Sequence, residues 1–273
     1  MLYRKYQPAP PLQPFVECYF VWDSEQNLPE AFRVESPPNG FGSIVLNYGG
    51  TYAIQNPKHS VLEVPAAFIT GQATHSYQLT LHDSIHMVGI VFKPTGLSNL
   101  FGLPMYEFSD ERFDLLAVLG EKVQGLYDRI GEAPDMATRV TLLEQFLLYR
   151  LSLLKNPLNR TDYAANLIVE KRGVININEL IGDLYICRRQ FERQFLHKIG
   201  VSAKYYARIR RISYLCAELA SNRWNVSDWH EIIYKAGYYD QSHFIKDFTG
   251  FTGKSPSLYV KSNIELANYL RDE

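Results

Sequence analysis

The sequence predicts a two-domain α+β protein, with a β-rich N-terminal domain followed by helices and then an all-α C-terminal domain. The first observation is the length, because 273 residues suit two domains at roughly 100 to 200 residues each. The second is a change of apolar period near Asp110, from alternation to a helical pattern. The pair Asn156-Pro157 breaks that pattern, so we expect domains at 1–158 and 159–273.

Short apolar or alternating runs, separated by Pro, Gly and Asn, fill the first 110 residues and predict strands. The expected strands are 15–22, 43–48, 51–54, 66–70, 77–81 and 85–92. Many short strands at this spacing are typical of a sandwich or barrel. Two helices are expected over about 111–155, packed on the strands or on a second copy of the chain.

Cysteine content and hydropathy limit the class of protein. Cys18, Cys187 and Cys216 are an odd number without C-x-x-C spacing, which supports neither a zinc site nor a disulfide framework. The sequence shows no apolar run of a signal peptide or of a membrane span. We therefore expect a soluble, cytoplasmic protein with no membrane partner, no metal and no cofactor.

The net charge of −1 conceals a difference between the two parts of the chain. Residues 1–161 hold 12 Lys and Arg against 16 Asp and Glu, whereas 170–261 hold 15 against 9. Within 188–211 only Glu192 opposes eight basic side chains. Such a cluster is either a solvated helix face or a nucleic-acid surface, and the asymmetry favours a nucleic-acid partner for the C-terminal part.

The C-terminal part contains an internal repeat at an offset of 53 residues. Five pairs are identical: Phe191 and Phe244, Phe195 and Phe248, Gly200 and Gly253, Ser202 and Ser255, and Tyr206 and Tyr259. Each copy predicts two short helices joined by a tight turn, over about 176–200 and 227–253, with Asn176 and Asp240 as helix caps. This pattern is that of a helix-turn-helix, or of a generic helical hairpin.

A continuous helical pattern over 202–222 links the two copies. At 1.5 Å per residue this helix is about 32 Å long. The second helix of each copy could therefore reach one of two successive major grooves, which lie about 34 to 36 Å apart. Opposite the phenylalanines of the first copy lie Arg189, Glu192 and Arg193, which suit guanine and cytosine edges. The matching face of the second copy carries Ser242, Ile245 and Lys246, with Gln241 beside them. This face is weaker for base reading and suits phosphates better.

These residues resemble the C-terminal domain of the AraC/XylS family of bacterial transcription regulators, and the match is long at EIIYKAGYYDQSHFIKDFTGFTGKSPSLY (231–259). The first copy departs from the family at Tyr185, where a small turn residue is usual, and at Cys187, where a Ser cap is usual. The resemblance implies a sequence-specific regulator that binds double-stranded DNA, with RNA polymerase as a further partner. It places base reading at Arg189, Glu192, Arg193, Gln241, Ser242 and Lys246, and phosphate or supporting contacts at Arg188, Gln190, Lys204, Arg208 and Asp240.

The N-terminal part resembles the N-terminal domain of a branch of the same family, in the segments FVECYFVW and GIVFKPTGLSNLFGLPMYEFSD. The resemblance implies that this domain has a cupin-like fold, binds an effector and dimerises. Four aromatics at strand spacing are either core or the lining of an effector pocket: Tyr19, Trp22, Tyr48 and Tyr77. An apolar stripe of Leu142, Phe146 and Tyr149 is either packed on its own domain or a homodimer surface.

Two alternatives come from other classes of protein. A cupin-like metal-dependent enzyme would need converging ligands, for which His59, His75, His82 and His86 are the candidates. A turn at Asp83-Ser84 separates the last two, so we expect structural histidines and no catalytic residues. In the other alternative, the β-rich domain binds no ligand and only dimerises, and the sequence does not separate this from a sensor.

Overall fold

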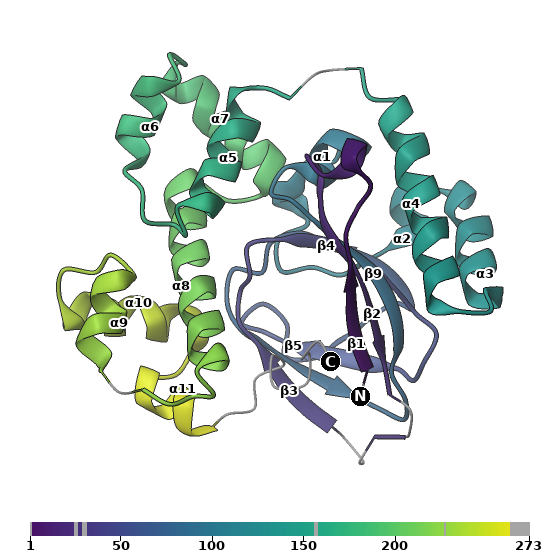
Figure 1. The fold of residues 1–273 in the computed structure, drawn as a ribbon, viewed down its shortest axis with the longest axis horizontal. Helices are drawn as coiled ribbons and strands as arrows, with labels where there is room; N and C mark the ends of the chain where they lie inside the picture. Colours follow the sequence, from purple (N-terminus) through teal and green to yellow (C-terminus); the bar gives the residue numbers. More distant parts are fainter. Residues whose placement is uncertain (1, 25–26, 29–31, 156–157, 227, 263–273) are drawn as a thin grey trace.

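The computed structural model describes residues 2–24, 27–28, 32–155, 158–226 and 228–262. Figure 1 shows a β-rich part and a helical part side by side. The N-terminal part holds two antiparallel sheets, with neighbouring strands paired as the alternating apolar pattern requires. The α+β class predicted from the sequence is therefore confirmed.

The two sheets form a sandwich. The first has the order β1 (Leu2–Tyr6), β2 (Val16–Asp23), β9 (His86–Phe92), β4 (Gly42–Asn47), β7 (Ala67–Thr70) and β10 (Phe113–Asp114). The second has the order β3 (Phe32–Ser36), β8 (Tyr77–Leu81), β5 (Tyr52–Gln55) and β6 (Leu62–Glu63). Successive side chains of a strand face opposite sides, so Tyr19 and Val21 of β2 lie in one apolar cluster and Trp22 in another.

Helices cover the outer face of the larger sheet (Figure 1). They are α1 (Gly96–Phe101), α2 (Leu115–Leu119), α3 (Gln124–Glu132) and α4 (Met136–Ser152), with short 3-10 turns η1 (Pro10–Leu12), η2 (Met105–Glu107) and η3 (Glu121–Val123). Leu143 and Leu147 of α4 are fully buried against the strands, together with Tyr19 and Ile90. Burial of these apolar side chains holds the helices on the sheet.

The predicted strands are confirmed at β2, β4, β5, β7, β8 and β9. The helix expected from residue 111 is wrong in part, because the segment is divided into β10, α2, η3 and α3. Gly120 causes one of these breaks: its φ of +80° belongs to a backbone region that glycine adopts without strain.

The C-terminal part is entirely helical between its turns. Its helices are α5 (Arg160–Glu170), α6 (Ile177–Asp183), α7 (Arg188–Ile199), α8 (Ala203–Ser221), α9 (Trp229–Lys235), α10 (Gln241–Thr252) and α11 (Pro256–Ser262). They share one apolar core, whose residues all lie between Ala164 and Val260. Because this core is separate from those of the sheets, we propose the domain boundary at 158/159. Within the described ranges, no helix has the length and apolar character needed to cross a membrane.

Candidate functional site

The first helix-turn-helix is formed by α6 and α7. Asn176 caps α6, accepting hydrogen bonds from the backbone N–H groups of Asn178 and Glu179. Tyr185 lies in the turn with a φ of +49°, a conformation that costs a non-glycine residue about 1–2 kcal/mol. Cys187 stands at the start of α7 without a side-chain cap hydrogen bond. Both departures from the family pattern therefore weaken this turn.

The second helix-turn-helix, α9 and α10, has the residues that the first lacks. Gly237 takes the left-handed turn position with a φ of +72°, and the Asp240 carboxylate accepts a hydrogen bond from the backbone N–H of His243. The turn between α9 and α10 spans 236–240, one residue more than the turn 184–187. The two copies are consequently offset by 52 residues at their first helices and by 53 at their second.

The phenylalanines of both second helices face inward, as the repeat predicts. Phe191, Phe195, Phe244 and Phe248 are all buried, and Gly200 and Gly253 end the helices in the left-handed conformation. The opposite faces are exposed to solvent. They carry Arg189, Glu192 and Arg193 on α7, and Gln241, Ser242 and Lys246 on α10. Base reading by these six side chains stays a prediction.

Several supporting residues have partners within the domain. The Arg188 guanidinium donates to Glu192 at 2.9 Å, so the two exposed side chains pair along α7. Arg208 of α8 donates to the Asp247 carboxylate at 2.7 Å, and this hydrogen bond to Asp247 holds the pKa of Arg208 above its ordinary value. This pair ties α8 to α10. Gln190, Lys204 and Asp240 lie at the exposed surface.

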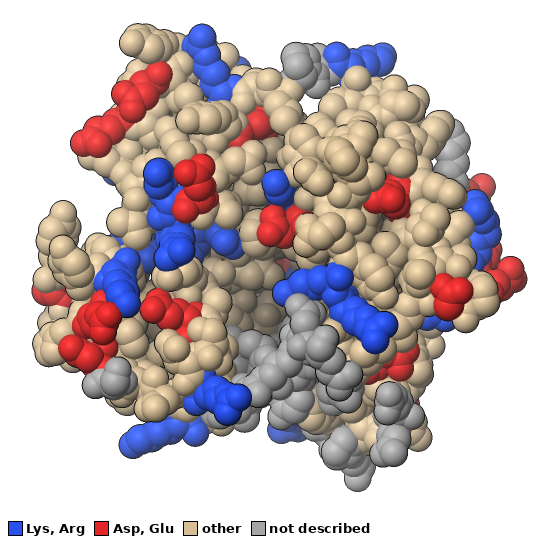
Figure 2. All heavy atoms as spheres, in the orientation of Figure 1, with Lys and Arg blue, Asp and Glu red and all other residues tan. Residues whose placement is uncertain are grey.

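Helix α8 joins the two copies. Its 19 residues make a rod of about 28 Å, slightly shorter than the sequence predicts. Figure 1 shows α7 above it and α10 beside its lower half, and Figure 2 shows basic side chains gathering over its length. Two exposed second helices on one rigid linker define the arrangement of a double helix-turn-helix DNA-binding domain.

Comparison with known proteins agrees with this class. Residues 182–262 match the family model described as a helix-turn-helix domain, and residues 4–114 match a domain of unknown function, DUF6597. The C-terminal domain is a helix-turn-helix domain of the AraC type, and the chain is a DNA-binding transcription regulator. No match to a curated protein was found.

The chain is also similar to solved structures of ToxT from Vibrio cholerae. One at 1.65 Å resolution has 14% identity and a TM-score of 0.48, covering 88% of this chain and 98% of that one. Another, with an unsaturated fatty acid bound, has 13% identity and a TM-score of 0.45, covering 92% and 99%.

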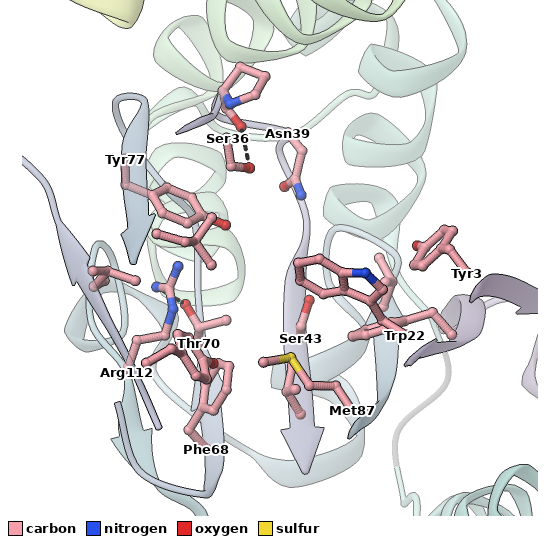
Figure 3. A pocket seen from close by; sticks show the side chains of 17 residues that line it. Tyr3, Trp22, Ser36, Asn39, Ser43, Phe68, Thr70, Tyr77, Met87 and Arg112 are labelled. Carbon is pink, nitrogen blue, oxygen red and sulfur yellow. Dashed lines mark hydrogen bonds between the residues drawn. The ribbon is translucent and has the colours of Figure 1, made fainter. Parts of the chain in front are cut away.

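A second candidate site is a cavity of about 280 Å³ between the two sheets. Figure 3 shows Trp22 and Met87 on one side of the open space, with Tyr77, Phe68 and Arg112 on the other. Of the four predicted pocket aromatics, Trp22 and Tyr77 line the cavity. Tyr19 and Tyr48 do not line this cavity. Their side chains face the helices, where Tyr48 stacks on Tyr127 with ring centroids 4.8 Å apart.

Sequence reasoning missed most of the residues that line the cavity, among them the charged residue Arg112. It precedes β10 in a segment that reads as helix, so no periodic pattern marks it. Its guanidinium donates through Nη1 to the Thr70 hydroxyl at 2.6 Å and to the Glu111 carbonyl at 2.9 Å. The central guanidinium carbon, Cζ, also lies 4.9 Å from the centre of the Tyr77 ring. The cavity therefore has a cation among aromatic rings.

One segment, 36–41, contacts both candidate sites. Ser36, Pro37 and Asn39 line the cavity. From the same segment, the Gly40 carbonyl accepts a buried hydrogen bond of 2.8 Å from the Tyr206 hydroxyl of α8. Arg210 of α8 donates to the Asn39 carbonyl and lies over the Phe41 ring at 4.4 Å. We call residues 36–41 the coupling segment.

Buried polar contacts join the domains elsewhere. Lys198 of α7 donates to both Asp162 oxygens at 2.8 Å and to Asn99 of α1 at 2.9 Å. Burial alone would raise the pKa of Asp162, but hydrogen bonds from Lys198, the Asn159 backbone and Asn99 hold it below the usual range. Helix α7, the second helix of the first helix-turn-helix, is thereby tied to both domains.

The candidate metal histidines are dispersed. His59 contacts Glu111 at 3.0 Å, His86 contacts Asp23 at 2.9 Å, and His75 contacts Thr74 at 2.8 Å. His82 is exposed in a turn. In the part of the chain that the structure describes, no three His, Cys, Asp or Glu side chains are grouped to hold a metal ion.

Proposed function

We propose that the β-rich domain controls the DNA-binding domain according to whether a small-molecule effector occupies the cavity. The observation that carries this proposal is the coupling segment, because residues that line the cavity and residues that hold α8 are neighbours in one short stretch of backbone. A ligand against Ser36, Pro37 or Asn39 displaces the carbonyls that Tyr206 and Arg210 contact. The position of α8 sets the spacing of the two reading helices.

The contacts around Arg210 make this connection sensitive. Burial lowers the pKa of the Arg210 guanidinium, and its Nε is buried without a hydrogen-bond partner. Besides the Asn39 carbonyl and the Phe41 ring, Tyr206 and Glu17 interact with the Arg210 charge, so a displaced carbonyl changes the surroundings of a buried cation. Effector binding and DNA binding are then linked, and each must change the equilibrium of the other by the same factor.

This linkage can be tested without knowing the effector. Saturating the full chain with a DNA sequence selected from a random library should change amide hydrogen exchange in residues 36–41 and in the strands around the cavity. The substitution Tyr206→Phe removes the bond to Gly40, worth about 0.5–1.5 kcal/mol, and should reduce that change. Ser221→Ala, at the far end of α8, is the matched control.

The result that would refute the linkage is equally specific. If the exchange of the β-rich domain is identical with and without bound DNA, the two domains are not coupled through this segment. The Tyr206→Phe chain must still bind the selected DNA, which shows that its reading helices are folded.

The proposal includes a homodimer formed through α4. Tyr149 is 60% exposed, and Leu142 and Phe146 are partly exposed beside it, whereas the core-facing residues of α4 are Val140, Leu143 and Leu147. Sedimentation of the full chain should show a dimer that Tyr149→Glu dissociates and Thr141→Glu, outside the stripe, does not. A monomer at all concentrations, with and without DNA, would remove the dimer from the proposal.

RNA polymerase is the partner through which a bound regulator would act on transcription.

A further inference from the structure

We infer that the cavity binds an organic carboxylate with a flat, apolar body, and that Arg112 is the residue that binds its carboxylate. The inference rests on the proposed function, since it names the class of effector for that cavity. It follows from the walls of the cavity, from the partners of Arg112 and from the geometry of a guanidinium.

The walls select for an apolar body. Trp22, Tyr52 and Phe68 present aromatic surface, and Ile54, Leu79 and Met87 add aliphatic and thioether groups. Most of these side chains are nearly inaccessible from outside, so a molecule in contact with them loses its water shell. A sugar or other polyhydroxy compound needs a hydrogen-bond partner for each hydroxyl, and these walls supply few. A flat ring or short hydrocarbon fits them better.

Among the described residues, the groups around Arg112 include no carboxylate that neutralises its charge. The described residues include no carboxylate in an ion pair with Arg112. The nearest acid in sequence, Glu111, pairs with Lys58 and His59, and Asp114 caps α2. Phe68 and Tyr77 face the guanidinium at 5.9 and 4.9 Å, which orients it but does not neutralise it.

The donors of Arg112 suit a carboxylate. Among the described residues, both hydrogen bonds of Arg112 use Nη1, and neither Nε nor Nη2 has a partner. The free donors of a guanidinium form the planar pair that matches two carboxylate oxygens. A phosphate carries close to two negative charges and is usually held by several cations and backbone N–H groups, whereas Arg112 is the single cation among the described residues that line this cavity. One carboxylate therefore balances the site.

A purely structural role for Arg112 is the alternative, in which it only joins β7 to the segment before β10. If Arg112 binds a carboxylate, an acid binds more tightly than its amide, whereas a purely structural Arg112 gives no such preference. The probes are phenylacetate, cinnamate and indole-3-acetate, each compared with its neutral amide, which changes the charge and keeps the shape. Binding to the full chain is measured by titration calorimetry and by the shift in thermal midpoint.

We expect at least one acid to bind about tenfold or more tightly than its amide, because a charge-assisted, bidentate contact is lost in the amide. Arg112→Gln should abolish this preference, and Arg112→Lys should restore part of it. The matched control is Arg139→Gln: Arg139 also lies over a tyrosine ring, Tyr48, at 5.6 Å, but outside the cavity. This variant should keep the preference for acids.

The outcomes separate the inference from the proposed function. If amides bind as tightly as acids, or if Arg112→Gln keeps the preference, the carboxylate assignment is wrong while an effector cavity stands. If neither acids nor amides bind at millimolar concentration, the ligand class is wrong. If acids bind as expected but hydrogen exchange shows no coupling to DNA, the ligand class holds and the proposed control of DNA binding fails.

Discussion

Replacing Lys198 with Met is expected to lower the free energy of unfolding by about 3–5 kcal/mol, because it leaves a buried carboxylate without its cation. The Asp162 side chain is 1% exposed and that of Lys198 is 16% exposed. Methionine keeps the length of the side chain and removes its charge, so lost packing contributes little. The measurement is urea unfolding at neutral pH.

Lys235→Met is the matched control for this substitution. Lys235 pairs with Glu231 at 2.7 Å on α9, but both side chains are more than half exposed, and such pairs contribute about 0–1 kcal/mol. Equal losses of unfolding free energy in the two variants would show that the buried Asp162–Lys198 pair stabilises the fold no more than an exposed pair does. The comparison therefore isolates burial as the cause.

The pH dependence of the Lys198→Met effect follows from the same contacts. Because the pKa of Asp162 is lowered in the folded state, its contribution to stability is present above the unfolded pKa of about 3.9. That contribution is lost as the pH falls through the lower, folded pKa. We expect the difference between the original chain and Lys198→Met to shrink below about pH 4.

Arg189→Ala and Arg193→Ala should each cost about 1–3 kcal/mol of discrimination between bases, because a guanidinium pairs with guanine through two hydrogen bonds. The resemblance assigns Lys246 to base reading, but the α10 face of Ser242 and Lys246 suits phosphate better than base edges, so Lys246→Ala should weaken binding to all sequences alike. All three side chains are exposed, so the substitutions leave the core intact. Selection from a random DNA library for each variant measures the preference directly.

A reversed result would overturn this division of roles. If Lys246→Ala changes the selected sequence while Arg193→Ala does not, α10 reads bases and α7 holds phosphate. Lys261→Ala, on α11 outside both reading helices, is the control and should select the same sequence as the original chain.

The helical domain could be predicted closely because its local signals agree with its fold. Ser202 and Asp240 cap their helices, Gly200 and Gly253 end theirs, and the buried phenylalanines recur at helical spacing. The two departures in the first turn, Tyr185 and Cys187, are also visible in the sequence, and the structure places them at a left-handed position and at an uncapped helix start.

The sandwich could be predicted only in part. Alternation places Tyr19 and Trp22, three residues apart, on opposite faces of β2, but it does not say which face meets the other sheet. Which of the two lines the cavity could therefore not be predicted. The strands β1 and β3 were missed because they carry charged residues between their apolar ones. Contacts such as Arg210 with Asn39 depend on how two domains meet, and no local pattern encodes them.

The central claim, that two helix-turn-helices of one chain bind DNA, is tested most directly by the salt dependence of binding by the full chain. The account predicts that log affinity for selected duplex DNA falls linearly with log salt, with a slope of about −0.9 for each phosphate contacted. Combining Arg189→Ala, Arg193→Ala and Lys246→Ala should weaken binding and make the slope shallower. A folded chain whose binding to duplex DNA is absent, or is unaffected by salt, would contradict it.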